Sequence, residues 1–231
     1  MNRTLSLFEE RKSEIEFYYS ILTDIDTSNG RINTIDNPRF ERILKSNFLL
    51  MLYNLIEACI SSGFIEIYEA IENHGISYVD VISELQKKWS DYKVSSQSSE
   101  STANQNTYKK IVASILDDVL AKKPLSFQTN RRQEFIKNVL GVSGNLDARQ
   151  IRDLLSCHKI DFSDQMDKPK MYIVKQKRNQ LAHGEESFEN SARDYSVSEL
   201  EAFKDEVLTF IQAVLVAMQG YYDDKKYVSS V

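Results

Sequence analysis

The stretch from Lys168 to Gly184 carries the side chains of this sequence that are best suited to chemistry. It holds four lysines and one arginine, Arg178, and no acidic residue, within a chain whose formal net charge is −5. A local excess of five positive charges suits a polyanion such as RNA. The alternative is a basic helix face that does no more than stay solvated.

Helical geometry gives Arg178 an unusual setting. At about 100° per residue, Arg178 falls in the middle of an apolar arc rather than on the solvated side. The apolar members of this arc are Met171, Val174, Leu181 and Ala182. A guanidinium cannot be left unpaired among apolar groups, so we expect it to meet an acidic side chain, a phosphate or a second subunit.

His183 and Asn179 are the other two candidates for chemistry on this helix. They are four residues apart and therefore neighbours on one helix face. His183 precedes Gly184 at the expected helix end, where the negative end of the dipole favours a protonated imidazole. Such a histidine can donate a proton or hold a phosphate. The plain alternative is that Arg178 pairs with a core carboxylate and His183 only caps the helix.

The elements that must position these residues are helical. Only 7 Gly and 3 Pro serve 231 residues, too few for the many tight turns of an all-β fold. Apolar periodicity predicts four core helices, of which the second is central. They span about 3–23, 38–74, 167–183 and 197–222. We expect one domain over 1–231.

The middle of the chain, about 75–160, is expected to carry shorter helices. They are predicted over 78–89, 108–121, 131–140 and 148–158. The Ser-, Asn- and Gln-rich residues 90–107 are expected to form a mobile surface loop, and residues 26–37 a second loop. Asp147 is expected as an N-cap, and Ser196 with Glu199 as a capping box.

Cysteine and histidine usage narrows the class of protein. Cys59 and Cys157 cannot build a disulfide framework, which favours a cytoplasmic protein. The start of the chain is charged within ten residues and predicts no secretory signal. The most apolar run, Phe48–Ile56, is too short to cross a bilayer, so no membrane is expected. The His and Cys residues are scattered, so no metal site is expected. The sequence has no glycine-rich phosphate loop, so no cofactor is expected.

These residues resemble a known family. Arg178-Asn-Gln-Leu-Ala-His183 has the R-N-x-x-x-H form of the HEPN superfamily. The continuation His-Gly-Glu-x-x-Phe at 183–188, the Ser-Glu-Leu at 198–200 and the helix Leu44–Glu57 are similar to the MAE-type HEPN-like nucleases. The resemblance covers roughly 38–74 and 165–220 and leaves 75–160 unmatched.

A second stretch has the bare motif as well. Arg152 and His158 are separated by five residues, within the four to six that the motif allows, but the polar neighbour is missing. Leu154 and Leu155 between them are typical core positions, so we interpret this match as coincidental.

The resemblance implies metal-independent RNA cleavage by a dimer in which two motifs face one cleft. His183 would act as general base or general acid, Arg178 would hold the scissile phosphate, and Asn179 would orient either one. Lys170, Lys175 and Lys177 would bind the flanking phosphates. The expected products are a 2′,3′-cyclic phosphate and a 5′-hydroxyl.

The resemblance also implies a role in a toxin–antitoxin pair or in antiphage defence. The expected partners are RNA, a second copy or a related HEPN chain, and an antitoxin. Family toxins that are silenced by AMP transfer carry a Tyr where this chain has Glu185, which argues against that regulation here. Two alternatives stay open: a non-catalytic HEPN-like module that binds RNA or a partner nuclease, and a bundle in which Arg178 is purely structural.

Overall fold

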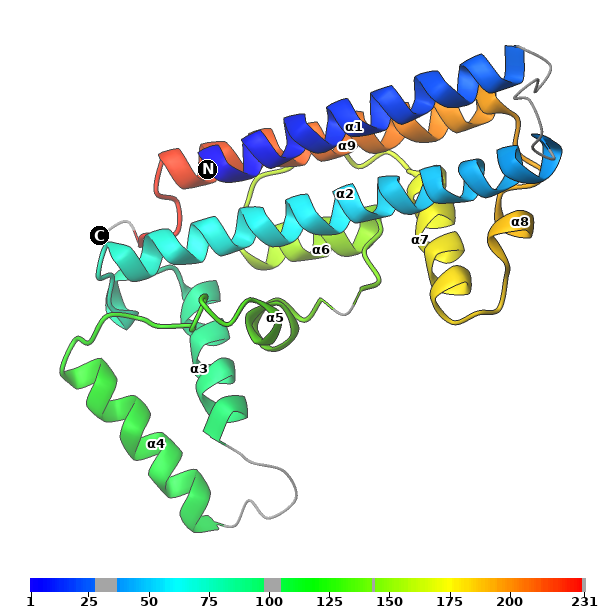
Figure 1. Cartoon of the computed structure of the whole chain (residues 1–231). Coiled ribbons are helices and arrows are strands. Elements are labelled where there is room, and N and C mark those ends of the chain that lie inside the picture. The colour runs from blue at the N-terminus through cyan, green and yellow to red at the C-terminus, as the bar shows by residue number, and fades with distance from the viewer. Residues whose placement is uncertain (28–36, 98–104, 143, 230–231) are drawn as a thin grey trace.

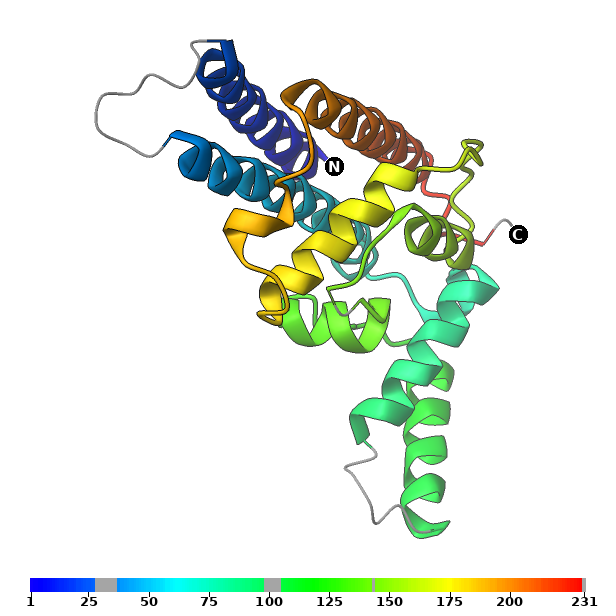
Figure 2. The same ribbon diagram turned by 90° about the vertical axis from the view of Figure 1, so that its right-hand side faces the viewer.

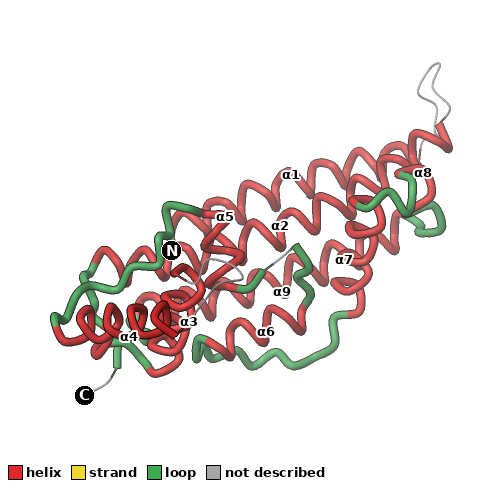
Figure 3. The backbone as a smooth tube through the Cα atoms, turned by 90° about the horizontal axis from the view of Figure 1, so that it is seen from below, coloured by secondary structure: helices red, strands yellow, loops and turns green. Residues whose placement is uncertain are grey.

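The computed structural model describes residues 1–27, 37–97, 105–142 and 144–229. Within these ranges every regular element is a helix, which confirms the predicted all-α class (Figure 3). The elements are α1 (Asn2–Thr27), α2 (Asn37–Asn73), η1 (Tyr78–Asp80), α3 (Ser83–Gln97), α4 (Gln105–Leu120), α5 (Arg132–Phe135), η2 (Ile136–Leu140), α6 (Ala148–Cys157), α7 (Pro169–Ala182), α8 (Phe188–Ser191) and α9 (Val197–Asp223).

Three long helices form the core. Figures 1 and 2 show α1, α2 and α9 side by side, with α7 crossing them. The α2 helix contacts α1, α7, α8 and α9, so it is the central helix that the sequence predicts. Its middle is buried on several faces, as at Phe48, Leu49 and Tyr53. Burial all round a helix is what packing between several neighbours requires.

The length and hydropathy of α2 would suffice to cross a membrane. The helix from Pro38 to Asn73 passes that test, and 72% of its most apolar window is buried inside the fold. The nine-residue run Phe48–Ile56, from which the sequence predicts no membrane span, is therefore only part of a longer apolar stretch of this helix. Burial of that extent is typical of the core helix of a bundle.

The predicted helix starts are confirmed where a cap marks them. The Asp147 side chain accepts the backbone N–H of Gln150 and completes a capping box at the start of α6. Ser196 and Glu199 form the same reciprocal pair at the start of α9. Each box satisfies backbone donors that a helix end otherwise leaves unpaired.

The expected loop over 90–107 is wrong in the part that the structure describes. Residues 90–97 continue α3, which begins at Ser83 rather than near 78, and 105–107 open α4; residues 98–104 lie outside the described residues. Leu85 and Trp89 are buried and anchor the first turns of α3. An anchored helix extends into polar residues because propagation is far easier than nucleation.

Other boundaries differ by less. The helix predicted over 131–140 is α5 followed by the single π-helical turn η2. The short α8 was missed, and residues 26 and 27 belong to α1. Of the loop expected over 26–37, residues 28–36 lie outside the described residues.

The pair α3 and α4 projects from the long helices (Figures 1 and 2). Lys93 of α3 pairs with Asp118 of α4 at 2.9 Å and holds the two together. The outer face of α4 exposes a row of large apolar side chains, at steps of four residues. They are Tyr108, Val112, Leu116 and Leu120.

Candidate functional site

Arg178 lies on the side of α7 that faces α2. Its guanidinium stacks over the Tyr53 ring at 4.9 Å, and its Nη1 donates to the Gly144 carbonyl at 3.0 Å. The nearest carboxylate is Glu57, whose Oε2 is 4.0 Å from Nη2. Arg178 therefore meets partners, as its place on the apolar arc predicts, but they are mainly a ring and a carbonyl. Its side chain stays 28% exposed.

The apolar arc around Arg178 holds only in the first half of α7. Met171 and Val174 are fully buried, whereas Leu181 is half-buried and Ala182 is exposed. Figure 1 shows the reason, because the C-terminal half of α7 extends beyond α2. Arg178 thus lies where the packed part of the helix gives way to solvent.

Asn179 is joined to Arg178 by a side-chain hydrogen bond. Its Oδ1 accepts from Arg178 Nη1 at 3.1 Å, and its Nδ2 donates to Asn145 Oδ1 at 2.6 Å. The expected neighbour, His183, is linked to Asn179 only through its backbone N–H, at 2.9 Å. The structure brings together Arg178 and Asn179.

His183 caps α7 as the sequence predicts. The helix ends at Ala182, His183 is the C-cap, and Gly184 follows with φ +70°. The His183 side chain is exposed, and among the described residues no recorded contact joins it to Arg178. Five residues of helix turn the chain by about 500°, so the two side chains leave α7 about 140° apart. Within one chain they do not form a pair.

Each of the predicted phosphate-binding lysines is paired with a carboxylate. Lys175 contacts Asp147, Lys177 Nζ is 3.0 Å from Glu186, and Lys170 Nζ is 3.9 Å from Glu206. These partners lie outside the stretch, so the charge counted within Lys168–Gly184 overstated the local positive field.

Among these carboxylates, Asp147 accepts hydrogen bonds both from its lysine and from the backbone. Burial raises its pKa, but the hydrogen bonds from Lys175 and from the Gln150 backbone outweigh it, and its pKa lies below the ordinary value. It therefore stays ionised at neutral pH. Asp147 fixes Lys175 and caps α6 at the same time.

The segment Gly144–Asp147 lies alongside α7 and contacts three of its residues. Gly144 contacts Arg178, Asn145 contacts Asn179, and Asp147 contacts Lys175. Gly144 has φ +71°, and a Cβ there would lie 3.1 Å from Arg178 Nη2. Only glycine meets both conditions without strain.

Sequence reasoning missed the Gly144–Asp147 segment and the two α2 residues Tyr53 and Glu57. Asp147 was identified, but only as a cap. The one available signal was the Gly-Asn pair at 144–145, which is typical of backbone with positive φ. Nothing in the spacing indicated that the segment lies against α7, 30 residues later.

The second motif match serves the core. His158 is fully buried, with its Nε2 2.9 Å from the Tyr68 hydroxyl and its Nδ1 2.6 Å from the Leu154 carbonyl. Burial, with Lys88 nearby, lowers its pKa to about 3. Arg152 donates to the carbonyls of Asp164 and Met166. This bears out the interpretation of the match as coincidental.

Two further observations bear on the site. Among the residues that the structure describes, no three His, Cys, Asp or Glu side chains are gathered as metal ligands would be. A family model described as HEPN_MAE_28990/-like HEPN matches residues 3–227. No curated protein and no solved structure matches the chain.

Proposed function

Because the chain belongs to the MAE-type HEPN-like family, many of whose relatives in the HEPN superfamily are ribonucleases, we propose that it is an endoribonuclease. In this proposal it cuts RNA without a metal. The 2′-oxygen attacks the adjacent phosphorus while the bond to the 5′-oxygen breaks, which leaves a 2′,3′-cyclic phosphate and a 5′-hydroxyl.

The observation that carries the proposal is the state of the Arg178 guanidinium. One nitrogen, Nη1, makes both recorded hydrogen bonds, to Gly144 and Asn179. Among the described residues, Nε and Nη2 make none, and the carboxylate of Glu57 stays at 4.0 Å. The Nε–Nη2 edge is the fork that binds two phosphate oxygens. A guanidinium that is fixed through one nitrogen and keeps two nitrogens without hydrogen bonds to the described residues suits the charge of a phosphoryl transition state.

His183 supplies the proton transfer in this proposal. Its exposed ring can take the proton of the 2′-hydroxyl while water protonates the leaving 5′-oxygen, or it can give a proton to that oxygen while water takes the proton of the 2′-hydroxyl. Since Arg178 and His183 leave α7 about 140° apart, a second copy of the chain has to bring its own motif to the cleft. The proposed assembly is a dimer, with itself or with a related HEPN chain.

The proposed role and location follow from the family alone. The nuclease would act in the cytoplasm as a toxin held by an antitoxin, or as an antiphage effector. Induced expression is then expected to arrest growth, and Arg178→Ala to relieve the arrest.

A non-catalytic RNA- or protein-binding module is the second candidate. The observation in its favour is that, among the described residues, His183 does not contact Arg178, so a single chain lacks an assembled Arg–His pair. Such a module would bind RNA or a partner nuclease and leave the RNA intact.

One assay separates the candidates. The purified protein is incubated in EDTA with an RNA and with the DNA of the same sequence, beside Arg178→Ala and His183→Ala. The nuclease cuts only the RNA, resists the chelator and is inactive in both variants. RNA that is bound but intact in all samples would favour the binding module. Loss of folding in Arg178→Ala, with no RNA binding by the parent, would favour a structural role.

A further inference from the structure

A groove of about 740 Å³ lies between α2 and the turn formed by α5 and η2. It shares Glu57 with the candidate site, because this carboxylate lines the groove and also lies 4.0 Å from Arg178. Val142, two residues before Gly144, lines the groove as well. The groove is therefore continuous with the surroundings of the Arg178 guanidinium.

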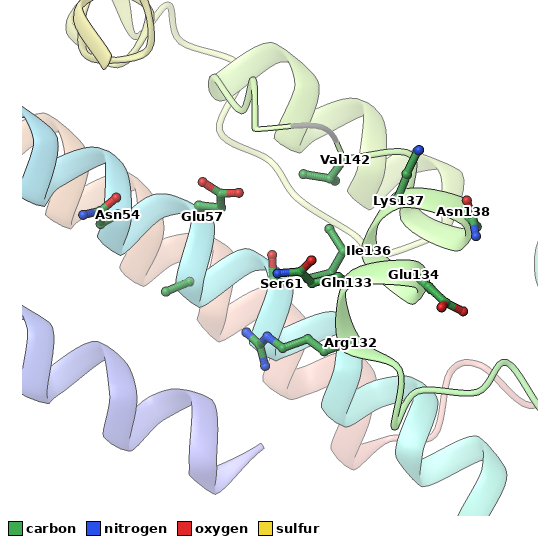
Figure 4. Close-up of a pocket in the computed structure, with 11 residues that line it drawn as sticks. Asn54, Glu57, Ser61, Arg132, Gln133, Glu134, Ile136, Lys137, Asn138 and Val142 are labelled. Atoms are coloured by element: carbon green, nitrogen blue, oxygen red, sulfur yellow. The ribbon is translucent and has the colours of Figure 1, made fainter. Parts of the chain in front are cut away.

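Figure 4 shows which lining residues face the groove. Ser61 and Gln133 point toward one another between α2 and α5, and Arg132 reaches across toward α2. Glu134, Lys137 and Asn138 lie on the outer side, away from α2.

Ser61 is the observation that points to a ligand. Its side chain is only 3% exposed, and its Oγ has no hydrogen-bond partner among the described residues. A buried hydroxyl without a partner is costly in a folded protein. A ligand in the groove that displaced the exposed Gln133 side chain, which points at Ser61 in Figure 4, would reach this hydroxyl and supply the missing partner.

The other groups make the groove amphipathic. Ala58, Ile136 and Val142 give it apolar sides, while Gln133 offers an exposed amide that makes no side-chain hydrogen bond among the described residues. Arg132 is exposed and, among the described residues, forms no ion pair, unlike the lysines of α7. A flat ring with a polar edge beside an anionic group fits this set of contacts.

We infer that the groove binds the nucleoside next to the phosphate held by Arg178, and that Arg132 contacts the following phosphate. The inference rests on the proposed function for its substrate class. The apolar side chains take the faces of the base, and Gln133 and Ser61 take its polar edge. Glu57, between groove and guanidinium, accepts a hydrogen bond from a ribose hydroxyl. The groove thereby selects the base beside the cleavage point.

Arg131 provides a matched control for Arg132. It is the preceding residue, is equally charged and exposed, and pairs with Glu134 at 3.4 Å on the outer side. Arg132→Gln and Arg131→Gln change the net charge equally, so a difference between them reports the groove and not the overall field.

The test measures binding of a short fluorescent single-stranded RNA in EDTA, in the His183→Ala background. Arg132→Gln is expected to weaken binding about fivefold at 0.1 M salt and to lower the salt slope by about 0.7, the value for one phosphate contact on a single strand. Arg131→Gln is expected to change affinity less than about twofold. Equal effects of the two variants would overturn the inference.

Ser61→Ala gives a second and independent readout. It is expected to weaken RNA binding about threefold to tenfold, as for one lost hydrogen bond, without lowering the melting temperature. Gln133→Ala is expected to flatten the preference among the four 3′-mononucleotides, measured by calorimetry. Ser61→Ala protein that binds RNA like the parent would contradict the assignment.

The groove and the nuclease can fail separately. If RNA binds through Arg132 and Ser61 but the parent chain leaves it intact, the nucleoside-binding groove is supported and the nuclease function is contradicted. If cleavage depends on Arg178 and His183 while Arg132→Gln and Ser61→Ala leave affinity and rate unchanged, the nuclease function is supported and the nucleoside-binding groove is contradicted.

Discussion

Gly144 is one of the groups that position Arg178, beside the Tyr53 ring and the Asn179 amide. Gly144 accepts a hydrogen bond from the Arg178 guanidinium through the backbone and leaves the space that a Cβ would fill, 3.1 Å from Nη2. The same loop holds Gly141, with φ +70° and nothing within 4 Å of a Cβ. The two glycines have equal backbone demands, and only one of them touches the site.

Gly144→Ala and Gly141→Ala are therefore expected to separate strain from site geometry. Each costs about 1 to 2 kcal/mol of stability, because an L-residue is held in the left-handed region. Only Gly144→Ala also moves Arg178, and we expect it alone to weaken RNA binding. Urea denaturation gives the stabilities and fluorescence anisotropy the affinities. Equal losses of affinity would show that the contact with Gly144 does not matter.

His158 sets a pH dependence of stability. Burial lowers its pKa to about 3 in the folded chain, against an ordinary value near 6.5 when unfolded. Below about pH 6.5 the unfolded chain takes up a proton that the folded chain refuses. The stability that the neutral, buried His158 contributes is thus fully present above pH 6.5 and is lost as the pH falls toward 3.

The expected loss is about 1.2 kcal/mol between pH 6 and pH 5. The carboxylates with lowered pKa, such as Asp147 and Asp164, titrate at lower pH and leave this window to His158. Urea melts at several pH values measure the slope in the parent chain and in His158→Gln. A slope that persists in His158→Gln would assign it to other groups.

At the scale of elements, Asp147 joins α6 to α7. It caps α6 through the Gln150 backbone and pairs with Lys175 across the loop. Asp147→Asn keeps an oxygen for the cap and removes the charge, whereas Asp147→Ala removes both. The two variants divide the functions of one side chain.

We expect Asp147→Ala to lose about 1 kcal/mol of stability through the cap, and Asp147→Asn to lose clearly less. Both free the Lys175 ammonium, so RNA binding is expected to tighten and its salt slope to steepen. Circular dichroism melts and anisotropy titrations in rising salt provide the two readouts. Unchanged RNA affinity in both variants would mean that Lys175 does not contact the nucleic acid.

What the sequence predicts well at this scale is local. The caps at Asp147 and Ser196 involve residues three apart, and the sequence alone identifies them. The end of α7 at His183–Gly184 is of the same kind. The carboxylates that neutralise Lys170 and Lys175 are 36 and 28 residues away in sequence, and no periodicity indicates them. The polar end of α3 was missed because its helix is held by buried residues upstream.

At the scale of the whole molecule, the central position of α2 follows from an apolar surface that is too wide for one neighbour. The contact between the Gly144–Asp147 segment and α7 depends on the packed fold, so it could not be derived from spacing. The candidate site was thus predictable as residue types on one helix. Its partners on α2 and on the segment were not.

The separation of Arg178 and His183 around α7 makes a prediction for the assembly. If each of the two Arg–His pairs in the shared cleft takes its arginine from one copy and its histidine from the other, a mixture of Arg178→Ala and His183→Ala chains contains one intact pair, of two, in each mixed dimer. Random mixing gives half mixed dimers, so about a quarter of the parent activity is expected to return. Each variant alone stays inactive.

The matched control mixes Arg178→Ala with the Arg178→Ala/His183→Ala double variant, which offers no intact pair in any combination. Purification over two different affinity tags, one on each variant, establishes that the mixed species form. Mixed dimers without recovered activity would require both side chains to act from one chain, against their 140° separation on α7. Leu116→Ser with Leu120→Ser on the exposed face of α4 is expected to leave the proposed dimer intact. A monomer in that variant would move the interface to α4, far from a shared cleft, and would remove the basis for pairing the two motifs.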